Sequence, residues 1–224
     1  MAIGTVYLAG SGDERILRTV VASALATAAT PARVAVSYAA VAGSKRGVAH
    51  LQRGTQAMFP GSVVTRFAVA GETDAMPESQ ARRIIDDSDL IFLSGGDPAL
   101  GAKVLAAAGA ADWLRRARAR GAALVGVSAG SIMLGAWWAE WPEDEGDAAG
   151  TLVSCTAVVP DLVVDCHDEQ SDWEELRLVA RLLEEQGETP RLYGIPAGGA
   201  LVIDAEGRVA VEGSRPFVLP RSPN

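Results

Sequence analysis

The sequence predicts an α/β protein with a doubly wound, mostly parallel sheet and helices on both faces. Short apolar runs with the length of buried strands alternate with amphipathic or Ala-rich stretches of helical length. Of the 224 residues, 49% are hydrophobic, which is enough to bury a substantial core. We therefore expect a single domain over residues 1–224.

The alternation defines the expected elements in chain order. The strands are expected at 5–10, 32–40, 63–69, 89–93 and 122–127, and the helices at 13–30, 45–58, 77–87, 98–119 and 129–139. After Trp141 come an acidic, turn-rich segment at 142–147, strand-like runs at 151–159 and 161–166, and a helix at 172–186. The tail from 193 to 219 has turns at 205–207 and 212–214, which predicts short antiparallel strands added to the sheet.

Charge and composition exclude several classes of function. The chain has 28 acidic and 20 basic residues, and this net charge of −8 works against binding nucleic acid or an anionic membrane. The N-terminus lacks the features of a signal peptide and no apolar run is long enough to span a membrane, so a cytoplasmic location is the default. With only Cys155 and Cys166, we expect buried free thiols rather than a disulfide scaffold.

The most informative segment contains Gly-x-Ser-x-Gly between an expected strand and an expected helix. It reads Gly126-Val127-Ser128-Ala129-Gly130. At a nucleophile elbow the turn is so sharp that only small residues fit two positions before and after the serine. Ser128 would then project above the carboxyl edge of the sheet, and the Ala129 N–H at the start of the helix could stabilise an oxyanion. A Gly-rich turn without chemistry is the alternative.

A second Gly-rich turn follows the strand at 89–93. It reads Ser94-Gly95-Gly96-Asp97-Pro98. Its backbone could face Ser128 across the edge of the sheet, and Gly96 is the candidate for a second N–H to the oxyanion because no Cβ blocks approach. The same turn also fits a helix entry, with Asp97 as N-cap and Pro98 in the first turn.

The chain has two histidines as candidates for a general base. A base must accept the serine proton and return it to the leaving group, and imidazole has the appropriate pKa. His50 lies in an expected helix far from the elbow in sequence, whereas His167 ends a strand-like run and opens a loop rich in carboxylates. We therefore predict His167 as the base. Neither His nor Cys recurs at metal-ligand spacing, so we expect no metal and no cofactor.

These residues resemble the peptidase E family of serine peptidases, the S51 type, which includes aspartyl dipeptidase and cyanophycinase. Its fold is similar to class I glutamine amidotransferase domains. The segments that carry the resemblance are Leu93-Ser94-Gly95-Gly96-Asp97, Gly126-Val127-Ser128-Ala129-Gly130-Ser131, His167, and Gly194-Ile195-Pro196 leading into Ala200-Leu201-Val202-Ile203. The resemblance implies a peptidase of short peptides, with Ser128 as nucleophile, His167 as base, and amides of Gly96 and Ala129 at the oxyanion.

The third catalytic residue departs from the family pattern. Relatives resemble one another in a Glu after the Gly-Ile/Leu-Pro/Asp stretch, and here that position is Ala197. Glu169 and Asp165 remain as acceptors for the imidazole Nδ1 proton. Glu169 recreates the His-x-Glu spacing of the amidotransferase relatives and is preferred, whereas Asp165 would share a strand face with His167 through the period of two. A dyad without an acid, or loop carboxylates that are merely solvated, stays open.

The carboxylates around His167 also bear on the substrate. The resemblance implies that dipeptidase members of the family carry an Arg a few residues after the His, whereas this chain has Asp168, Glu169 and Asp172 there. These groups would repel an acidic side chain, so a neutral or basic substrate is expected. Two alternatives to a peptidase stay open, namely another amide or ester hydrolase and a non-catalytic binding module.

Three tryptophans follow the nucleophile helix. They are Trp137, Trp138 and Trp141. Such a cluster could wall a substrate pocket, because aromatic rings supply a large apolar area. It could equally belong to the core or to a contact between subunits, and a homodimer therefore stays open.

Overall fold

A central sheet organises the computed structural model, which describes residues 3–11, 13–141 and 150–220; the predicted acidic segment 142–147 lies outside them. In the described residues, this sheet has seven strands in the order β11 (Val209–Gly213), β10 (Gly199–Ile203), β1 (Val6–Ala9), β5 (Ala123–Val127), β4 (Leu90–Leu93), β2 (Arg33–Ser37) and β3 (Val63–Arg66). The strands β1, β5, β4, β2 and β3 are parallel, and β10 and β11 are antiparallel. The predicted α/β class and the antiparallel addition are confirmed.

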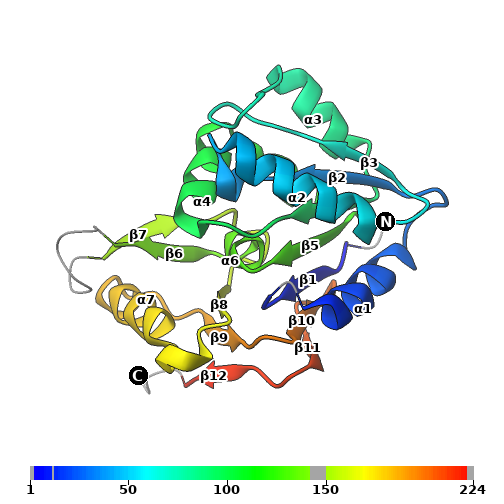
Figure 1. The fold of residues 1–224 in the computed structure, drawn as a ribbon. Helices are drawn as coiled ribbons and strands as arrows, with labels where there is room; N and C mark the ends of the chain where they lie inside the picture. Colours follow the sequence, from blue (N-terminus) through cyan, green and yellow to red (C-terminus); the bar gives the residue numbers. More distant parts are fainter. Residues whose placement is uncertain (1–2, 12, 142–149, 221–224) are drawn as a thin grey trace.

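Helices cover both faces of this sheet (Figure 1). One face carries α1 (Glu14–Leu25) and α2 (Lys45–Met58), and the other carries α3 (Glu78–Asp86), α4 (Pro98–Ala107), α5 (Ala110–Ala119) and α6 (Ala129–Leu134). Because side chains alternate across a strand, Leu124 joins the core under α3–α6 and its neighbour Val125 joins the core under α1 and α2. The doubly wound arrangement is therefore confirmed.

Two smaller sheets complete the fold on one side of the molecule. Strand β8 (Leu162–Cys166) pairs in parallel with β9 (Arg191–Ile195), which pairs antiparallel with β12 (Phe217–Leu219). Strands β6 (Trp137–Glu140) and β7 (Thr151–Ser154) form an antiparallel pair. Figure 1 shows helix α7 (Glu174–Glu185) beside these two sheets. The expected tail therefore divides, because β9 and β12 join the small sheet rather than the central one.

Three predicted helices are wrong in part, two of them at a glycine. The helix expected at 13–30 ends at Leu25. The helix expected at 129–139 ends at Leu134, because Gly135 has an extended backbone, and β6 follows. Extension of the chain after Gly135 allows Ala136 N to donate to Leu162 O at 2.8 Å, which joins the segment to the strands that follow it. The helix expected at 98–119 is interrupted at Gly109, whose φ of 68° is left-handed.

The strand-like run expected at 151–159 ends at Ser154, and two predicted strands of the central sheet are also too long. The strand expected at 32–40 ends at Ser37, and a single 3₁₀ turn at Ala39–Val41 follows it. The strand expected at 63–69 ends at Arg66. Both segments remain buried beyond the last paired residue, and apolarity alone therefore did not distinguish them from strand residues.

Other sequence expectations can be compared directly with the structure. Cys155 and Cys166 are buried free thiols, as predicted. Trp138 is buried in the core, and its ring packs edge-on against Trp141 with 5.9 Å between centroids. Trp137 also packs against the core. Within the described residues, no helix is both long and apolar enough to cross a membrane.

Candidate active site

Ser128 lies on a sharp turn between β5 and α6. Its backbone has a φ of 54° and a ψ of −123°. A non-glycine residue in such a conformation costs roughly 1–3 kcal/mol and persists only where its surroundings enforce it. Glycine makes the turn possible, because a Cβ on Gly126 would lie 2.6 Å from the carbonyl carbon of Gly130 and one on Gly130 would lie 2.0 Å from Leu93 O. The predicted steric reason for both glycines is confirmed.

The end of β1 holds the turn in place. Ala9 O accepts hydrogen bonds from Ser128 N at 2.9 Å and from Ser131 Oγ at 2.8 Å. Ala9 is the last residue of β1, the strand parallel to β5 on one side, and β4 lies on the other. The serine is therefore positioned at the carboxyl edge in the middle of the sheet, where ligands bind in folds of this type.

His167 lies beside Ser128 although the two residues are far apart in sequence. The Ser128 Oγ and His167 Nε2 atoms are 2.9 Å apart, within hydrogen-bond distance. His167 follows the last residue of β8, has a left-handed φ of 52°, and donates its backbone N–H to Ile195 O at 2.9 Å. Its side chain is exposed and that of Ser128 is half-buried. A proton on Oγ can therefore pass directly to the imidazole, within reach of solvent.

Two backbone segments at the edge could donate to an oxyanion. In α6, Ser131 N and Ile132 N donate to Ser128 O, and the amides at the start of the helix, including Ala129 N–H, have no carbonyl one turn earlier to bind. The other segment is the Gly95-Gly96 turn. A Cβ on Gly95 would lie 3.4 Å from the Ser128 Cβ, so this turn packs directly against the serine.

Both the backbone conformation and the available space require glycine at position 96. Its φ is +143°, and a Cβ there would lie 2.3 Å from Ala40 O. Asp97 caps α4 by accepting from Leu100 N at 3.0 Å, and Pro98 is in the first turn of the helix, as predicted. Sequence reasoning assigned no role to Gly95, although the tandem glycines were the signal that the backbone approaches another group here.

Asp165 has an environment that differs from the sequence expectation. The prediction that it shares a strand face with His167 is wrong, because β8 ends at Cys166 and the period of two does not extend to a residue with left-handed backbone. The Asp165 side chain is buried, Oδ1 accepts from Cys166 N at 2.7 Å, and Oδ2 has no partner among the described residues. Burial is the main reason that its pKa is raised to about 8; the hydrogen bond from Cys166 N opposes this shift, and the nearby carboxylates of Glu175, Asp168 and Glu169 add to it.

This shift predicts a pH-dependent stability that Asp165→Asn should remove. Between the unfolded pKa of about 4 and the folded value of about 8, the folded protein holds one more proton than the unfolded chain. The free energy of unfolding should therefore fall with rising pH in this window, by at most about 1.4 kcal/mol per unit. Urea denaturation of both proteins between about pH 5 and 8 measures the difference in slope. Identical slopes would mean that Asp165 is ionised at neutral pH.

Glu169 contacts the turn that contains Ala197. Its Oε1 accepts the Ala197 backbone N–H at 2.5 Å, so the carboxylate lies beside the position at which the resemblance leads us to expect a Glu. Within residues 3–11, 13–141 and 150–220, no hydrogen bond reaches Nδ1 of His167. The orienting roles of Glu169 and Asp165 therefore stay predictions.

The other reactive groups in the described part of the chain do not form a competing catalytic centre. His50 is exposed on α2, and no described residue is hydrogen-bonded to its ring. Cys166 precedes His167, but burial raises the pKa of its thiol well above the usual value, which disfavours a thiolate nucleophile. Across the described ranges, no cluster of three or more His, Cys, Asp or Glu residues could hold a metal ion.

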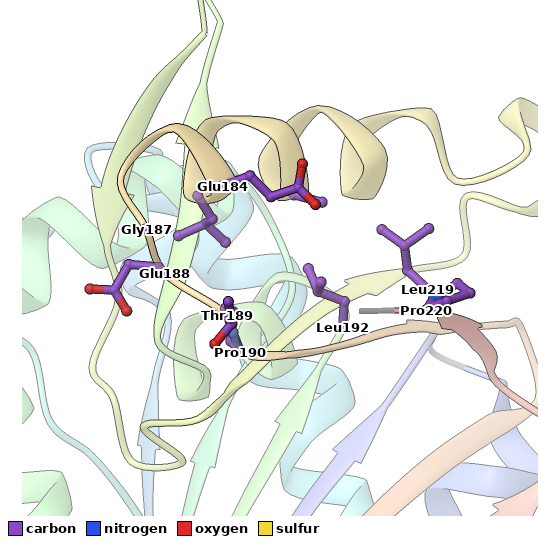
Figure 2. Close-up of a pocket in the computed structure, with 10 residues that line it drawn as sticks. Glu184, Gly187, Glu188, Thr189, Pro190, Leu192, Leu219 and Pro220 are labelled. Atoms are coloured by element: carbon purple, nitrogen blue, oxygen red, sulfur yellow. The ribbon is translucent and has the colours of Figure 1, made fainter. Parts of the chain in front are cut away.

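A cavity of about 300 Å³ lies elsewhere, between the C-terminal part of α7 and the strands β9 and β12 (Figure 2). It is lined by Ala180, Leu183, Glu184, Gly187, Glu188, Thr189, Pro190, Leu192, Leu219 and Pro220. None of the predicted site residues lines it, and the lining includes no histidine that could act as a base. The chemistry therefore points to the edge of the sheet at Ser128 rather than to this cavity.

The fold and this edge define an α/β protein with a strand–serine–helix elbow. The model of peptidase family S51 matches residues 65–210, which is more than half of the chain. The chain therefore belongs to peptidase family S51, and its function is that of a peptidase. A search of curated proteins found no match.

Two solved structures show the same fold. A crystal structure of a peptidase from an acI-B1 Actinobacterium is 19% identical, with a TM-score of 0.73 over 99% of this chain and 93% of that chain. A putative peptidase E protein from Listeria monocytogenes EGD-e is 16% identical, with a TM-score of 0.65 over 96% of this chain and 100% of that chain.

Proposed function

We propose that the protein is a serine peptidase that hydrolyses peptide or isopeptide bonds of short peptides. The observation that carries this proposal is the 2.9 Å contact between Ser128 Oγ and His167 Nε2, made at a strained elbow on the carboxyl edge of the sheet. A nucleophile within hydrogen-bond reach of a base is the arrangement required for covalent acyl transfer. Membership in a peptidase family supports the same reaction class.

The reaction follows from the positions of these groups. Ser128 Oγ attacks the carbonyl carbon while His167 Nε2 takes the hydroxyl proton. The N–H groups of Ala129 and Gly96 hold the oxyanion of the tetrahedral intermediate. As the C–N bond breaks, His167 returns the proton to the leaving amine. Water then attacks the acyl-enzyme with His167 again as base, which releases the acid and restores Ser128.

Active-site labelling tests this proposal against its two alternatives. A fluorophosphonate should modify Ser128, identified by mass spectrometry of the labelled peptide, and His167→Ala should slow the modification. An unlabelled Ser128 in folded protein would favour a non-catalytic binding module. Labelling without cleavage of any member of a peptide library, but with turnover of simple amides or esters, would favour another amide or ester hydrolase on this fold.

The same library measures the substrate preference. Asp168 and Glu169 lie next to the base in sequence, and no salt bridge joins either to a basic group in the described residues. Asp172 is paired with Arg177 at 3.2 Å, which partly neutralises it. Because unpaired carboxylates repel an acidic side chain and attract a basic one, neutral or basic residues at the cleaved bond fit this site better than acidic ones.

The third catalytic residue is tested by Glu169→Gln and Asp165→Asn, first separately and then combined. We expect only one of the two to matter strongly, and we propose Glu169. Loss of a true orienting acid lowers turnover by roughly 10⁴-fold because the imidazole loses its productive tautomer, whereas loss of a solvated carboxylate changes it little. If both single variants and the double variant keep near-normal turnover, His167 works without either acid, and Ala197→Glu becomes the next variant to assay.

A further inference from the structure

The loop that carries His167 has an unusual backbone. The loop covers residues 167–173, between β8 and α7. Three of these seven residues are non-glycine residues with a left-handed backbone, namely His167 at φ 52°, Asp172 at φ 52° and Trp173 at φ 61°. Each such residue costs roughly 1–3 kcal/mol and persists only where neighbouring structure enforces it. The hydrogen bonds within the loop, such as Trp173 N to Asp168 O at 3.1 Å, do not by themselves place it relative to Ser128.

The side chain of Trp173 ties this loop to the small sheet. It is buried, and its ring lies directly over the backbone of Gly194 in β9, where a Cβ would be 2.3 Å from Cε3 of the ring. Gly194 therefore leaves free the space that the indole occupies. A single glycine inside an apolar strand is the sequence signal for such a close approach.

Strand β12 adds a second aromatic ring to this contact. The Phe217 ring in β12 stacks on the Trp173 ring with 5.9 Å between centroids and 5° between planes. The guanidinium of Arg177 lies 5.0 Å from the centre of the Phe217 ring, and Arg177 Nε also donates to Asp172 O at 3.0 Å. The same cation therefore supports both the stack and the second left-handed residue of the loop.

The contact of Trp173 with Gly194 and Phe217, called the clamp below, is linked to His167 by the strand pairing of the small sheet. Gly194 is paired with Asp165 in β8 on one side and with Phe217 in β12 on the other. The next residue, Ile195, accepts the backbone N–H of His167. A shift of the indole off Gly194 would therefore be transmitted to His167 through one strand and one loop.

We propose that Trp173, Gly194 and Phe217 are positioning residues that hold His167 within reach of Ser128. This inference rests on the proposed function, and it assigns a catalytic requirement to β12, which lies beyond the matched residues 65–210. In this proposal the aromatic stack acts on the base through the loop and not by binding substrate. Removal of the stack should therefore lower kcat while leaving KM nearly unchanged.

Phe217→Leu tests the clamp, with Phe217→Tyr as the conservative variant and Val218→Ala as the matched control on the exposed side of β12. A misplacement of about 1 Å can cost roughly 10²-fold in rate, so we expect Phe217→Leu to lower kcat by about 10- to 100-fold. Phe217→Tyr keeps the ring and should retain wild-type turnover, as should Val218→Ala. Gly194→Ala should reproduce the Leu effect, because its methyl group displaces the indole.

The imidazole resonances give a readout that does not depend on a substrate. Since the chain has two histidines, NMR of His167 can be read against His50 on α2 as an internal reference. Phe217→Leu should shift or broaden the His167 signals alone and slow fluorophosphonate labelling of Ser128. Unchanged His167 signals and labelling in a folded Phe217→Leu protein would overturn the clamp. Retained hydrolysis in Ser128→Ala would instead refute the proposed function and leave the NMR test of the clamp intact.

Discussion

Ser128→Ala should abolish hydrolysis while the protein stays folded. The hydroxyl is the proposed nucleophile, and no second nucleophile lies within hydrogen-bond distance of His167 Nε2 in the described residues. The side chain is half-buried, and among the described residues its Oγ is hydrogen-bonded only to the imidazole, so its loss removes little packing. Residual activity should not exceed what the oxyanion donors and binding provide, roughly 10³- to 10⁴-fold over water.

Circular dichroism and turnover on one peptide panel measure both parts of this prediction. Ser128→Gly is a useful companion variant, because glycine removes the Cβ that makes the φ of 54° costly. It should be at least as stable as Ser128→Ala and equally inactive. Retained turnover in pure Ser128→Ala protein would end the serine-peptidase proposal.

His167→Ala should lower turnover by roughly 10⁴- to 10⁶-fold, because nucleophile and base act as a unit and the loss of either costs nearly the whole effect. Loss of the imidazole leaves Ser128 with no base at hydrogen-bond distance among the described residues. The exposed side chain contributes little to the core, so the melting temperature should change little.

His50→Ala is the matched control, since it removes the other imidazole of the chain from the exposed surface of α2. Both variants must be assayed on the same substrate. We expect His50→Ala to keep wild-type turnover. A greater loss in His50→Ala than in His167→Ala would contradict the assignment of the base.

Much of the fold could be predicted because local patterns and the tertiary environment agree. The helix expected at 45–58 is observed with the same bounds, and its start is marked by the Ser44 cap, which accepts from Gly47 N at 3.0 Å. The errors in the helices expected at 98–119 and 129–139 occur where a glycine decides the backbone, whereas the strands expected at 32–40 and 63–69 end early without one. Gly109 and Gly135 stand in apolar stretches that read as helix, and nothing local distinguishes an interior glycine from one that ends a helix. Whether residues 1–224 fold as one domain stays a proposal.

The residues of the candidate site differ in how much of their role and environment could be predicted from the sequence. Ser128 carries a local signature, because strand, serine and flanking glycines follow one another directly in the chain. His167 had to be chosen from a short list by its position after a strand. The environment of Asp165 could not be predicted, since its raised pKa comes from burial and from carboxylates on other elements. The stack of Trp173 on Phe217 joins residues from a loop and a distant strand.

The sequence by itself determined the α/β class, the elbow at Ser128 and the candidate base, because each depends on short-range patterns of apolarity, glycine and residue type. Only the tertiary structure decided that Ser128 Oγ and His167 Nε2 lie 2.9 Å apart, that β8 ends before His167, and that Glu169 binds the Ala197 amide. These contacts depend on how separate strands are placed side by side. That placement is set by the packing of two cores, which the order of residues along the chain does not display.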